Sequence, residues 1–528
     1  MFNLESPLPN TTTRHEQISR VVVTAQQMRD IEARIFAGGM PVAALMEKVA
    51  GLIARRIIEL YPRSHFPCIG ILVGPGHNGG DALVVARELH FQGYDIAVCC
   101  PFSKLKDLTA QHAQYVKSLG IPVDEALEPL AKCAVFVDGL FGFGLERSLS
   151  SPVDRIVDQL NEWSQPVVSI DLPSGLHTDT GEVLGTAVQA TQTFCLGLWK
   201  LGLLQDQALD YVGQAELIDF DIPIADIQAV LKTPKIQRIT PQSAIATLPL
   251  KRSPVTHKYK QGHLLLICGS RRYTGGAILT GLGARASGVG MLSIAVPESI
   301  KPLLSAQLPE ALIVGCPETA SGAIAQLQLP EKTDLSSFDA IACGPGLTVD
   351  AKRILQEVMN SDRPLVLDAD GLNILAQLGT IPTLQRRQAP TVLTPHAGEF
   401  KRLFPDTVDP TNDRIAAVRA AAAQSGAVVL LKGARTAIAD IDYVWINPES
   451  TPALARGGSG DVLTGLLGGL IAQATTKHIP LLEIVASAAW WHSQAGILAA
   501  RDRTEMGVDA FTLTQYLMSV VRNNRTIE

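Results

Sequence analysis

Apolar residues recur at helical spacing near the start of the chain. Thr24 and Gln27 have the form of a capping box, and apolar residues at positions 28, 31 and 35 follow on one face. Two glycines at 38 and 39 end this pattern, which predicts a helix over residues 25–37. A second helix is predicted from Pro41 to about Leu60, because its apolar residues again share one face. Residues 1–20 are polar and show no period, so we expect a mobile arm there.

After residue 60, short β-rich runs alternate with helical stretches. This alternation is typical of a mostly parallel, doubly wound sheet. The predicted strands of this first series are residues 69–73, 96–100, 135–137, 167–170 and 193–196, and residues 216–223 close the series.

A second alternating series follows a polar segment with four prolines, residues 224–255, which we interpret as an irregular interdomain connector. Its predicted strands are residues 263–268, 292–296, 341–343, 365–367, 392–394 and 428–431, and two helical stretches end it, residues 461–474 and 483–500. The pattern therefore predicts two α/β domains, residues 1–230 and 235–528.

Composition and charge exclude several classes of protein. Of the 528 residues, 46% are hydrophobic and 18% are charged, as in soluble globular domains and unlike disordered, collagen-like or coiled-coil chains. The net charge is −6 and lysines and arginines form no run, so we expect no nucleic-acid partner. The longest apolar stretch, residues 462–474, is shorter than the roughly 20 residues of a bilayer span. We expect a buried helix there and no membrane contact.

The start of the chain and the cysteines indicate a cellular location. The first 17 residues contain neither a basic leader nor an apolar segment, so no signal peptide is predicted. The eight cysteines include no CxxC pair, and Cys99, Cys268 and Cys343 lie in apolar runs. These features are typical of small core residues in a reducing compartment, and we expect a cytoplasmic protein.

A glycine-rich turn follows the first predicted strand of the sheet. The segment VGPGHNGGDALVVAR, residues 73–87, has the form of a strand, a tight turn and the start of a helix. Glycines let backbone N–H groups approach an anion, and a helix N-terminus carries roughly half a positive charge. The spacing differs from the GxGxxG dinucleotide fingerprint. The alternative interpretation is a plain βα turn in which Asp81 is a helix-start carboxylate.

Two further strand ends are polar and flanked by glycine: VDGLFGFG at residues 137–144 and IDLPSG at residues 170–175. Ligands of open α/β sheets bind beyond the carboxyl ends of the strands, so these three loops predict one crevice. Asn78, Asp138 and Ser174 offer hard oxygen ligands that suit an alkali or alkaline-earth ion rather than zinc. Each of the three alone is more often a turn-forming residue.

These motifs, with SIDLPSGLHTDTG at residues 169–181 and WKLGL at residues 199–203, resemble the YjeF N-terminal family, the NAD(P)H-hydrate epimerases. The similarity covers about residues 22–223 and implies a Rossmann-like doubly wound domain. It implies that potassium is bound at the positions of Asn78, Asp138 and Ser174. By the same resemblance, the substrate-binding positions are His77, Asn78, Gly79, Gly80, Asp81, Gly142, Phe143, Gly144, Leu145, Glu146, Arg147, Ser148 and Asp171.

One position departs from the family's pattern, because His77 stands where the family usually has asparagine. This puts one substrate contact in doubt but leaves the ion site intact. The hydrate at C6 of a reduced nicotinamide is a hemiaminal, so the ring nitrogen can help the hydroxyl leave, and water can return from either face. One carboxylate suffices for the proton transfers, and Asp171 is the candidate general acid/base.

In the second half, the turn RGGSGD at residues 456–461 precedes the predicted helix. A glycine turn at a helix N-terminus can bind an anion, and Asp461 is placed to deprotonate a hydroxyl that attacks a phosphoryl group. Four more strands end in polar or glycine-rich segments: KGART at 432–436, with cations and a hydroxyl suited to polyphosphate, TPHAGE at 394–399, DAD at 368–370 and CGPG at 343–346. Taken singly, His396 can simply cap a turn, Asp370 a helix, and Lys432 can form a surface ion pair.

These segments, with GSRRYTGGA at residues 269–277, resemble the ribokinase-like ADP-dependent NAD(P)H-hydrate dehydratases, the YjeF C-terminal family. The similarity covers about residues 259–513 and implies a ribokinase-like α/β domain. Three small departures, at Thr348, Gly371 and Ala397, remove no chemical group. By the resemblance, hydrate-binding positions are Ala277, Gly346, His396 and Asp461, and ADP-binding positions are Lys432, Gly433, Ala434, Arg435, Thr436 and Gly460.

The implied reaction phosphorylates the C6 hydroxyl, with Asp461 as base, after which phosphate leaves and the dihydronicotinamide re-forms. A magnesium ion is expected to bridge the phosphates, with Glu399 as a water-mediated contributor.

Together the two resemblances imply a bifunctional enzyme whose substrates are the hydrates NADHX and NADPHX, with an isomerase and a lyase activity. Assembly as a homo-oligomer through the second domain is also expected. The main alternative is a ribokinase-like vitamin or sugar kinase with a regulatory ligand-binding domain. A further alternative makes the first domain a binding module or scaffold.

Overall fold

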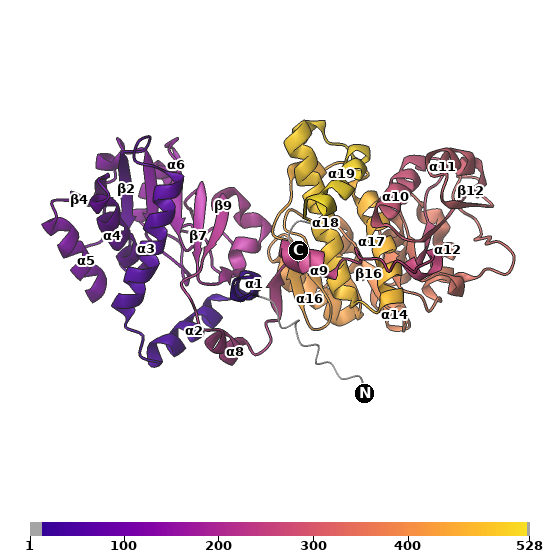
Figure 1. Cartoon of the computed structure of the whole chain (residues 1–528), viewed down its shortest axis with the longest axis horizontal. Coiled ribbons are helices and arrows are strands. Elements are labelled where there is room, and N and C mark those ends of the chain that lie inside the picture. Colours follow the sequence, from indigo (N-terminus) through magenta and orange to yellow (C-terminus); the bar gives the residue numbers. More distant parts are fainter. Residues whose placement is uncertain (1–12, 525–528) are drawn as a thin grey trace. The chain divides into compact units, whose positions relative to one another are not determined.

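A computed structural model describes residues 13–524 and divides the chain into two compact units between Ile236 and Gln237 (Figure 1). Each unit contains its own sheet and its own core. Both sheets are mainly parallel and alternate with helices, so the predicted α/β fold class is confirmed.

The first unit contains a seven-stranded parallel sheet in the order β4-β3-β2-β5-β6-β7-β9. A separate parallel pair joins β1 (Val22–Val23) to β8 (Trp199–Lys200). All six predicted strands are present, with β4 in addition. The strands of the large sheet are β2 (Cys68–Val73), β3 (Asp95–Cys99), β4 (Val123–Asp124), β5 (Val135–Gly139), β6 (Val167–Ile170), β7 (Gln192–Leu196) and β9 (Gln214–Ile218).

Alternate residues of these strands face two different helical layers, which makes the sheet doubly wound. Ile69 and Ile71 pack with the layer formed by α2 and its neighbours, whereas Leu72 and Phe136 pack against α6. Both early helices are confirmed, including the capping box at Thr24. The main helices of the unit are α2 (Ala25–Ala37), α3 (Val42–Leu60), α4 (His77–Phe91), α5 (Asp107–Ser118) and α6 (Val153–Asn161).

The expectation of a mobile arm over residues 1–20 is wrong for its last part, and residues 1–12 lie outside the described residues. Residues 14–20 form α1 (Arg14–Arg20), which Thr13 caps and whose Ile18 is fully buried. The Arg14 guanidinium forms an ion pair with Asp219, more than 200 residues away in the sequence. A helix of seven residues is too short to show a helical period in the sequence. The contact that holds it in place comes from a distant part of the chain, so no local pattern predicted it.

The second unit contains a ten-stranded sheet in the order β10-β19-β18-β17-β16-β15-β14-β11-β12-β13. It is parallel from β17 to β13, and β18 and β19 continue it antiparallel. The six predicted strands are present. They are β11 (His263–Ile267), β12 (Met291–Pro297), β14 (Ala340–Cys343), β15 (Leu365–Leu367), β16 (Thr391–Leu393) and β17 (Val428–Leu431). The sequence pattern did not predict four further strands, β10 (Ile236–Arg238), β13 (Leu312–Cys316), β18 (Ala437–Ala439) and β19 (Val444–Ile446).

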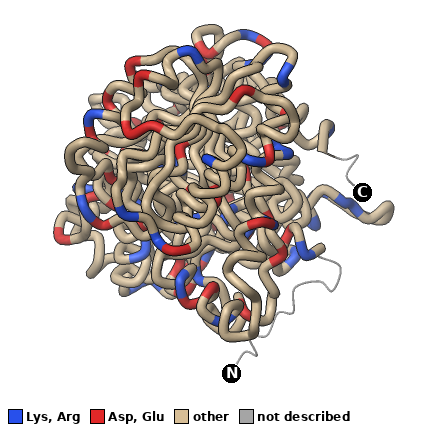
Figure 2. Tube along the Cα trace, turned by 90° about the vertical axis from the view of Figure 1, so that its left-hand side faces the viewer, with Lys and Arg blue, Asp and Glu red and all other residues tan. Residues whose placement is uncertain are grey.

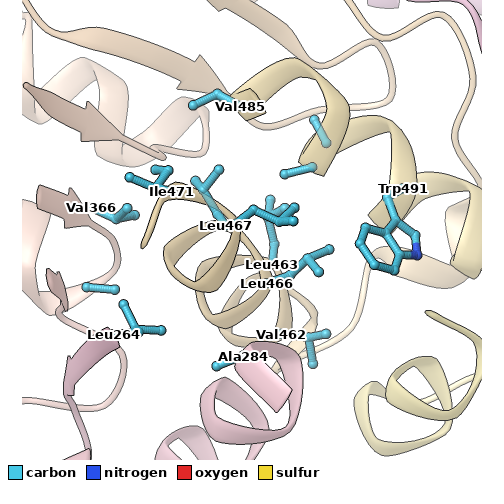
Figure 3. Packing of buried hydrophobic residues seen from close by; sticks show 14 of the residues in the cluster. Leu264, Ala284, Val366, Val462, Leu463, Leu466, Leu467, Ile471, Val485 and Trp491 are labelled. Carbon is cyan, nitrogen blue, oxygen red and sulfur yellow. The ribbon is translucent and has the colours of Figure 1, made fainter. Parts of the chain in front are cut away.

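The core of this unit forms around α17 (Ser459–Lys477), the predicted buried helix. Figure 3 shows its leucines between the sheet residues Leu264 and Val366 on one side and Trp491 on another. The neighbouring helices are α10 (Thr274–Ser287), α18 (Leu481–Arg503) and α19 (Ala510–Asn524). The indole N–H of Trp491 donates a hydrogen bond of 2.6 Å to the backbone oxygen of Leu517 on α19.

The remaining helices of the second unit follow single strands or connect them. They are α11 (Lys301–Gln307), α12 (Lys352–Met359), α13 (Asp370–Leu378), α14 (Thr380–Gln385), α15 (Ala397–Leu403) and α16 (Arg414–Ser425).

The predicted connector is more ordered than expected, because residues 224–255 contain α8 (Ile224–Leu231), β10 and α9 (Pro241–Thr247). α9 begins with a capping box formed by Thr240 and Ser243, and it packs on α18. The prolines concealed this helix, although proline is favourable in a first turn.

Charged residues of both signs are interspersed along the described part of the trace (Figure 2). Within residues 13–524, no single helix has the length and apolar character needed to cross a membrane; α2 and α3 meet the criterion together, bent by 120°. Cys99, Cys268 and Cys343 are fully buried, which confirms their interpretation as core residues.

The close crossing of α10 and α17 predicts how a substitution at Gly465 changes the free energy of unfolding. A methyl group on Gly465 would lie 1.8 Å from the backbone oxygen of Thr280, so we expect Gly465→Ala to destabilise the second unit by about 1–3 kcal/mol. Gly51→Ala is the matched control, since nothing lies within 4 Å of the added methyl on α3, and we expect it to stabilise by about 0.5–1 kcal/mol. Urea unfolding of both variants measures this. A Gly465→Ala chain as stable as the wild type would contradict the crossing.

Candidate active sites

A cavity of about 430 Å³ lies in the first unit, at the carboxyl ends of β2, β5 and β6. Loops that follow parallel strands meet at this edge of the sheet, which is where open α/β sheets bind ligands. The three loops singled out in the sequence therefore do form one crevice. The predicted substrate residues that line it are His77, Asn78, Asp81, Gly142, Phe143, Gly144, Leu145 and Asp171.

The other predicted substrate residues of this unit lie beside the cavity rather than in its lining. Gly79 and Gly80 are in the first turn of α4, and a side chain on Gly79 would come within 1.9 Å of the backbone oxygen of Gly74. Residues 146–148 (Glu146, Arg147 and Ser148) are exposed on the loop after β5. The glycines thus permit the tight turn, and the loop contacts the cavity through residues 142–145.

Asp138 and Ser174 form a buried hydrogen-bond network that joins the ends of β5 and β6. One oxygen of Asp138 accepts hydrogen bonds from the Ser174 hydroxyl (2.6 Å) and the Leu140 N–H (3.2 Å). Its other oxygen accepts from the Ser169 hydroxyl (2.8 Å) and the Ser174 N–H (2.9 Å). Burial raises the pKa of Asp138, and these hydrogen bonds oppose the shift.

The donor set around this network suits a monovalent cation. Asn78, Asp138 and Ser174 offer only oxygen ligands and a single carboxylate, and the buried side-chain nitrogen of Asn78 has no hydrogen-bond partner. Within residues 13–524, no three His, Cys, Asp or Glu side chains gather as a metal site. A divalent ion usually takes more carboxylates, so the residues fit an alkali ion.

Asp171 is fixed in the cavity wall by three donors. Its Oδ1 accepts a hydrogen bond of 2.5 Å from the amine of Lys200 and one of 3.3 Å from the Leu196 N–H; its Oδ2 accepts one of 2.9 Å from the Phe143 N–H. The side chains of Lys200 and Asp171 are 1% and 4% exposed. Burial alone would lower the pKa of Lys200, but the charge of Asp171 outweighs it and raises that pKa.

Two ionisable residues of this cavity had no role in the sequence analysis. Lys200 lies in the run WKLGL, where a lysine among apolar residues was the available signal. Glu32 on α2 directly follows the buried Ile31 and lies four residues after Met28, so it occupies the apolar face of the helix. Burial raises the pKa of Glu32 to about 7, against a lowering effect of Lys200. Burial also raises the pKa of Asp81 well above its ordinary value.

In the second unit, the N-termini of α10 and α17 converge with the loop after β14. Asp461 lies in the first turn of α17, and its Oδ2 is 3.2 Å from where a side chain on Gly276 would begin. The Cα of Gly346 is 3.9 Å from that same point. Ala277 is buried beside Gly276, against Gly269. These contacts bring three of the predicted hydrate-binding positions together.

The carboxyl group of Asp461 is poised for proton transfer. Burial raises its pKa to about 7, and the negative charge of Asp368 adds to the shift while Lys432 opposes it. Gly458, with a φ of +90°, precedes the helix and turns the chain so that the N–H groups of residues 460 and 461, in the first turn, can face an anion.

Lys432 forms a partly buried ion pair rather than the surface pair considered as an alternative, with side chains 23% exposed for Lys432 and 2% for Asp368. Its amine lies 2.7 Å from Asp368 and 3.8 Å from Glu399. The second oxygen of Asp368 accepts a hydrogen bond of 2.7 Å from Thr464 on α17. A side chain on Gly460 would begin 3.4 Å from the amine, so Lys432 lies against the glycine turn. Asp368, which links β15 to α17, had no assigned role in the sequence analysis.

The other predicted nucleotide positions form the exposed turn after β17. Gly433 and Ala434 are exposed, Arg435 is half-buried, and the Thr436 hydroxyl donates to the backbone oxygen of Gly433 at 3.1 Å. The buried guanidinium of Arg414 lies directly behind Gly433 and donates to the backbone oxygens of residues 431 and 432.

His396 has the capping role that was the alternative interpretation, whereas Asp370 is the first residue of α13 and does not cap it. The ring nitrogen Nδ1 of His396 accepts a hydrogen bond of 3.0 Å from the Gly398 N–H, and Glu399 accepts one of 2.8 Å from the His396 N–H. Asp370 accepts one of 2.9 Å from the Thr348 N–H. The His396 side chain is still 58% exposed, so its Nε2 edge can meet a ligand.

Comparisons with known proteins agree with both halves. A family model described as YjeF-related protein N-terminus matches residues 42–202, and one described as NAD(P)H-hydrate dehydratase matches residues 264–519. The chain is 55% identical over 505 residues to a bifunctional NAD(P)H-hydrate repair enzyme of Synechocystis sp., with 95% of each chain covered. The chain belongs to this family of bifunctional NAD(P)H-hydrate repair enzymes.

A second relative of the same name, from Thermosynechococcus vestitus, is 52% identical over 95% of this chain and 97% of its own. A solved structure of the ADP/ATP-dependent NAD(P)H-hydrate dehydratase of Bacillus subtilis, co-crystallised with ATP and Mg²⁺, is 33% identical. It covers 54% of this chain and 98% of its own, with a TM-score of 0.46. As a member of the NAD(P)H-hydrate repair enzymes, the chain combines an epimerase unit with a dehydratase unit.

The buried pair in the epimerase unit makes a stability prediction. We expect Lys200→Met to destabilise this unit by about 3–5 kcal/mol, because it leaves the Asp171 charge buried without its partner. Adding Asp171→Asn should recover part of the loss, since the charge is then gone as well. Denaturant unfolding of the two single variants and the double variant measures this. Additive losses in the double variant would show that the two charges do not stabilise each other.

Proposed function

We propose that the cavity of the first unit epimerises the hydrates NADHX and NADPHX, with Asp171 as general acid/base. The observation that carries the proposal is a carboxylate held by three donors in a 430 Å³ cavity at the strand ends. A carboxylic acid group gives a proton to the C6 hydroxyl, the ring nitrogen of the hydrate donates its lone pair to C6, the C6–O bond breaks, and water leaves. Water then adds to C6 from the other face and loses a proton to a carboxylate.

The family resemblance and the donor set both support potassium at Asn78, Asp138 and Ser174. The oxygen atoms of these three side chains and the presence of only one carboxylate among them favour it. A potassium ion there would supply a fixed positive charge beside the cavity. Asp138 and Ser174 hold the strand ends, and Asn78 begins the helix next to His77 and Asp81.

For the second unit we place the dehydratase chemistry at Asp461. The hydrate hydroxyl attacks the terminal phosphorus of ADP, Asp461 accepts the hydroxyl proton, and AMP leaves. The phosphate ester then loses phosphate with help from the ring nitrogen, and loss of a C5 proton restores the dihydronicotinamide. The N–H groups of residues 460 and 461 stabilise the charge of the transferring group.

Lys432 and residues 433–436 are the nucleotide positions in this proposal. The amine of Lys432 lies against Gly460, so it can contact a phosphate that sits on the glycine turn. Magnesium would bridge the phosphates and neutralise their charge, with Glu399 near Lys432 as a contributor through water. The preference for ADP over ATP and assembly as a homo-oligomer in the cytoplasm rest on the family resemblance.

Recovery of reduced-nicotinamide absorbance from a mixed R/S hydrate preparation tests both sites together. With ADP and magnesium we expect full conversion by the wild type, in a fast phase for the S epimer and a second phase for the R epimer. Asp461→Ala should lose about 10²- to 10⁴-fold in both phases, whereas Asp171→Asn should slow only the second. ATP and nucleotide-free samples are the controls. Epimerisation at the wild-type rate in Asp171→Asn would remove its assigned role.

The shifted pKa of Asp461 predicts the pH dependence of dehydration. A general base must be ionised, and this one has a pKa of about 7, so kcat/KM should fall about tenfold per pH unit below 7. Asp368→Asn should move this acid limb to lower pH, because it removes a negative charge that raises the pKa of Asp461 and releases Lys432, which lowers it.

The pH–rate profile with pure S hydrate measures this shift. Asp502→Asn, on the exposed end of α18, is the matched control for loss of one negative charge and should leave the limb in place. An acid limb that Asp368→Asn does not move would contradict the coupling.

A further inference from the structure

Three carboxyl groups line the epimerase cavity, and the proposed mechanism assigns proton transfer to only one of them, Asp171. Asp81, Asp171 and Glu32 all line it, and they come from three different elements: α4, the loop after β6, and α2. They are close enough that Asp171 raises the pKa of both Glu32 and Asp81, and Glu32 raises that of Asp81. The remaining charged or titratable lining residues are Arg29, His77, Lys106 and Lys200.

Lys200 contacts only one of the three carboxyl groups. Its amine contacts Asp171, and its side chain is almost fully buried. Within residues 13–524 the structure gives the carboxyl groups of Glu32 and Asp81 no hydrogen bond and no ion pair. Arg29, on the same helix as Glu32, instead contacts Gln26 and Glu146.

The two unpaired carboxyl groups differ in what they can do near neutral pH. The pKa of Asp81 is raised well above its ordinary value, chiefly by burial, which favours its protonated form and a role as hydrogen-bond donor. The pKa of Glu32 is raised to about 7, so Glu32 is present in both forms. A group that exchanges its proton at the working pH is the better acid and base.

The reaction itself calls for two proton-transfer groups. Epimerisation inverts C6, so the departing and the entering oxygen occupy opposite faces of the ring. Both oxygens of Asp171 already accept hydrogen bonds from the protein, which fixes this carboxylate in the wall. One fixed carboxylate can serve only one face unless the ring turns over in the cavity.

We propose that Glu32 is a second catalytic residue of the epimerase and exchanges a proton with the oxygen on the face of C6 that Asp171 does not serve. In one direction the Glu32 carboxylic acid gives its proton to the C6 hydroxyl. The C6–O bond breaks, water leaves, and the nitrogen lone pair forms a C6–N double bond. Water then attacks the other face and gives its proton to the Asp171 carboxylate. Asp171 then releases its proton to water and Glu32 takes one up from water, which restores both groups for the next turnover. The opposite direction reverses every transfer.

This inference rests on the epimerase activity of the first unit. In the full-length chain, the dehydratase activity of the second unit serves as an internal control. With saturating ADP and magnesium, the S epimer is consumed by the second unit and the R epimer only after epimerisation. We expect Glu32→Gln to slow the R phase at least 100-fold through kcat, with the S phase unchanged. Glu32→Asp, which keeps a carboxyl group, should retain part of the rate.

Two further variants separate chemistry from structure. Asp30→Asn changes an exposed acid on the same helix and should leave both phases at the wild-type rate. Asp81→Asn should weaken binding of the R hydrate while the R phase keeps its pH dependence near 7. In Glu32→Gln that dependence should disappear from the residual rate.

Oxygen exchange gives a second readout that a packing defect would not reproduce. The wild type should incorporate ¹⁸O from labelled water into both hydrates without any nucleotide, and Glu32→Gln should lose this exchange. An R phase within threefold of the wild type in Glu32→Gln, or a rise in KM with kcat unchanged, would overturn the proposal. A wild-type chain with an S phase but no R phase would instead remove the epimerase activity on which it rests.

Discussion

In each unit, a lysine pairs with one carboxylate, while another carboxyl group nearby, Glu32 or Asp461, has no hydrogen bond or ion pair within residues 13–524. Lys200 pairs with Asp171 in the first unit, and Lys432 pairs with Asp368 in the second. Burial of the remaining acids raises the pKa of Glu32 and of Asp461 to about 7. An incomplete charge balance at the strand ends thus yields, in each unit, a carboxyl group that can exchange a proton at neutral pH.

The parallel sheets make this arrangement possible. Every strand that delivers a site residue ends at the same edge, so residues far apart in sequence meet over a few ångströms. In the second unit, Thr464 in the core helix α17 donates to Asp368 at the end of β15, which ties the glycine turn of that helix to the sheet. The close crossing of α10 and α17 at Gly465 then sets the distance between Asp461 and Gly276. The packing of the core helices therefore also fixes the geometry of the site.

Most strands and the long helices could be predicted because their signals are local. Alternating β-rich and helical runs need only nearby residues, and the capping box at Thr24 is a four-residue pattern. The short helix at Arg14 was missed because a distant ion pair holds it, and α9 because its prolines resembled a linker. Glu32 and Lys200 were missed for a related reason. Glu32 lies among other charged residues and Lys200 in an apolar run, and neither position carries a local sign of its partners in the cavity.

The sequence by itself determined the family, the two α/β units and the loops that meet at each site, because motifs such as GPGHNGGD and GGSGD are contiguous and chemically specific. Only the tertiary structure decided which acids share a cavity and which lysine each one meets. Ionisation depends on burial and on charges a few ångströms away. Those neighbours come from distant parts of the chain, as with Glu32 and Lys200 or Asp368 and Lys432, so their protonation follows from the folded geometry.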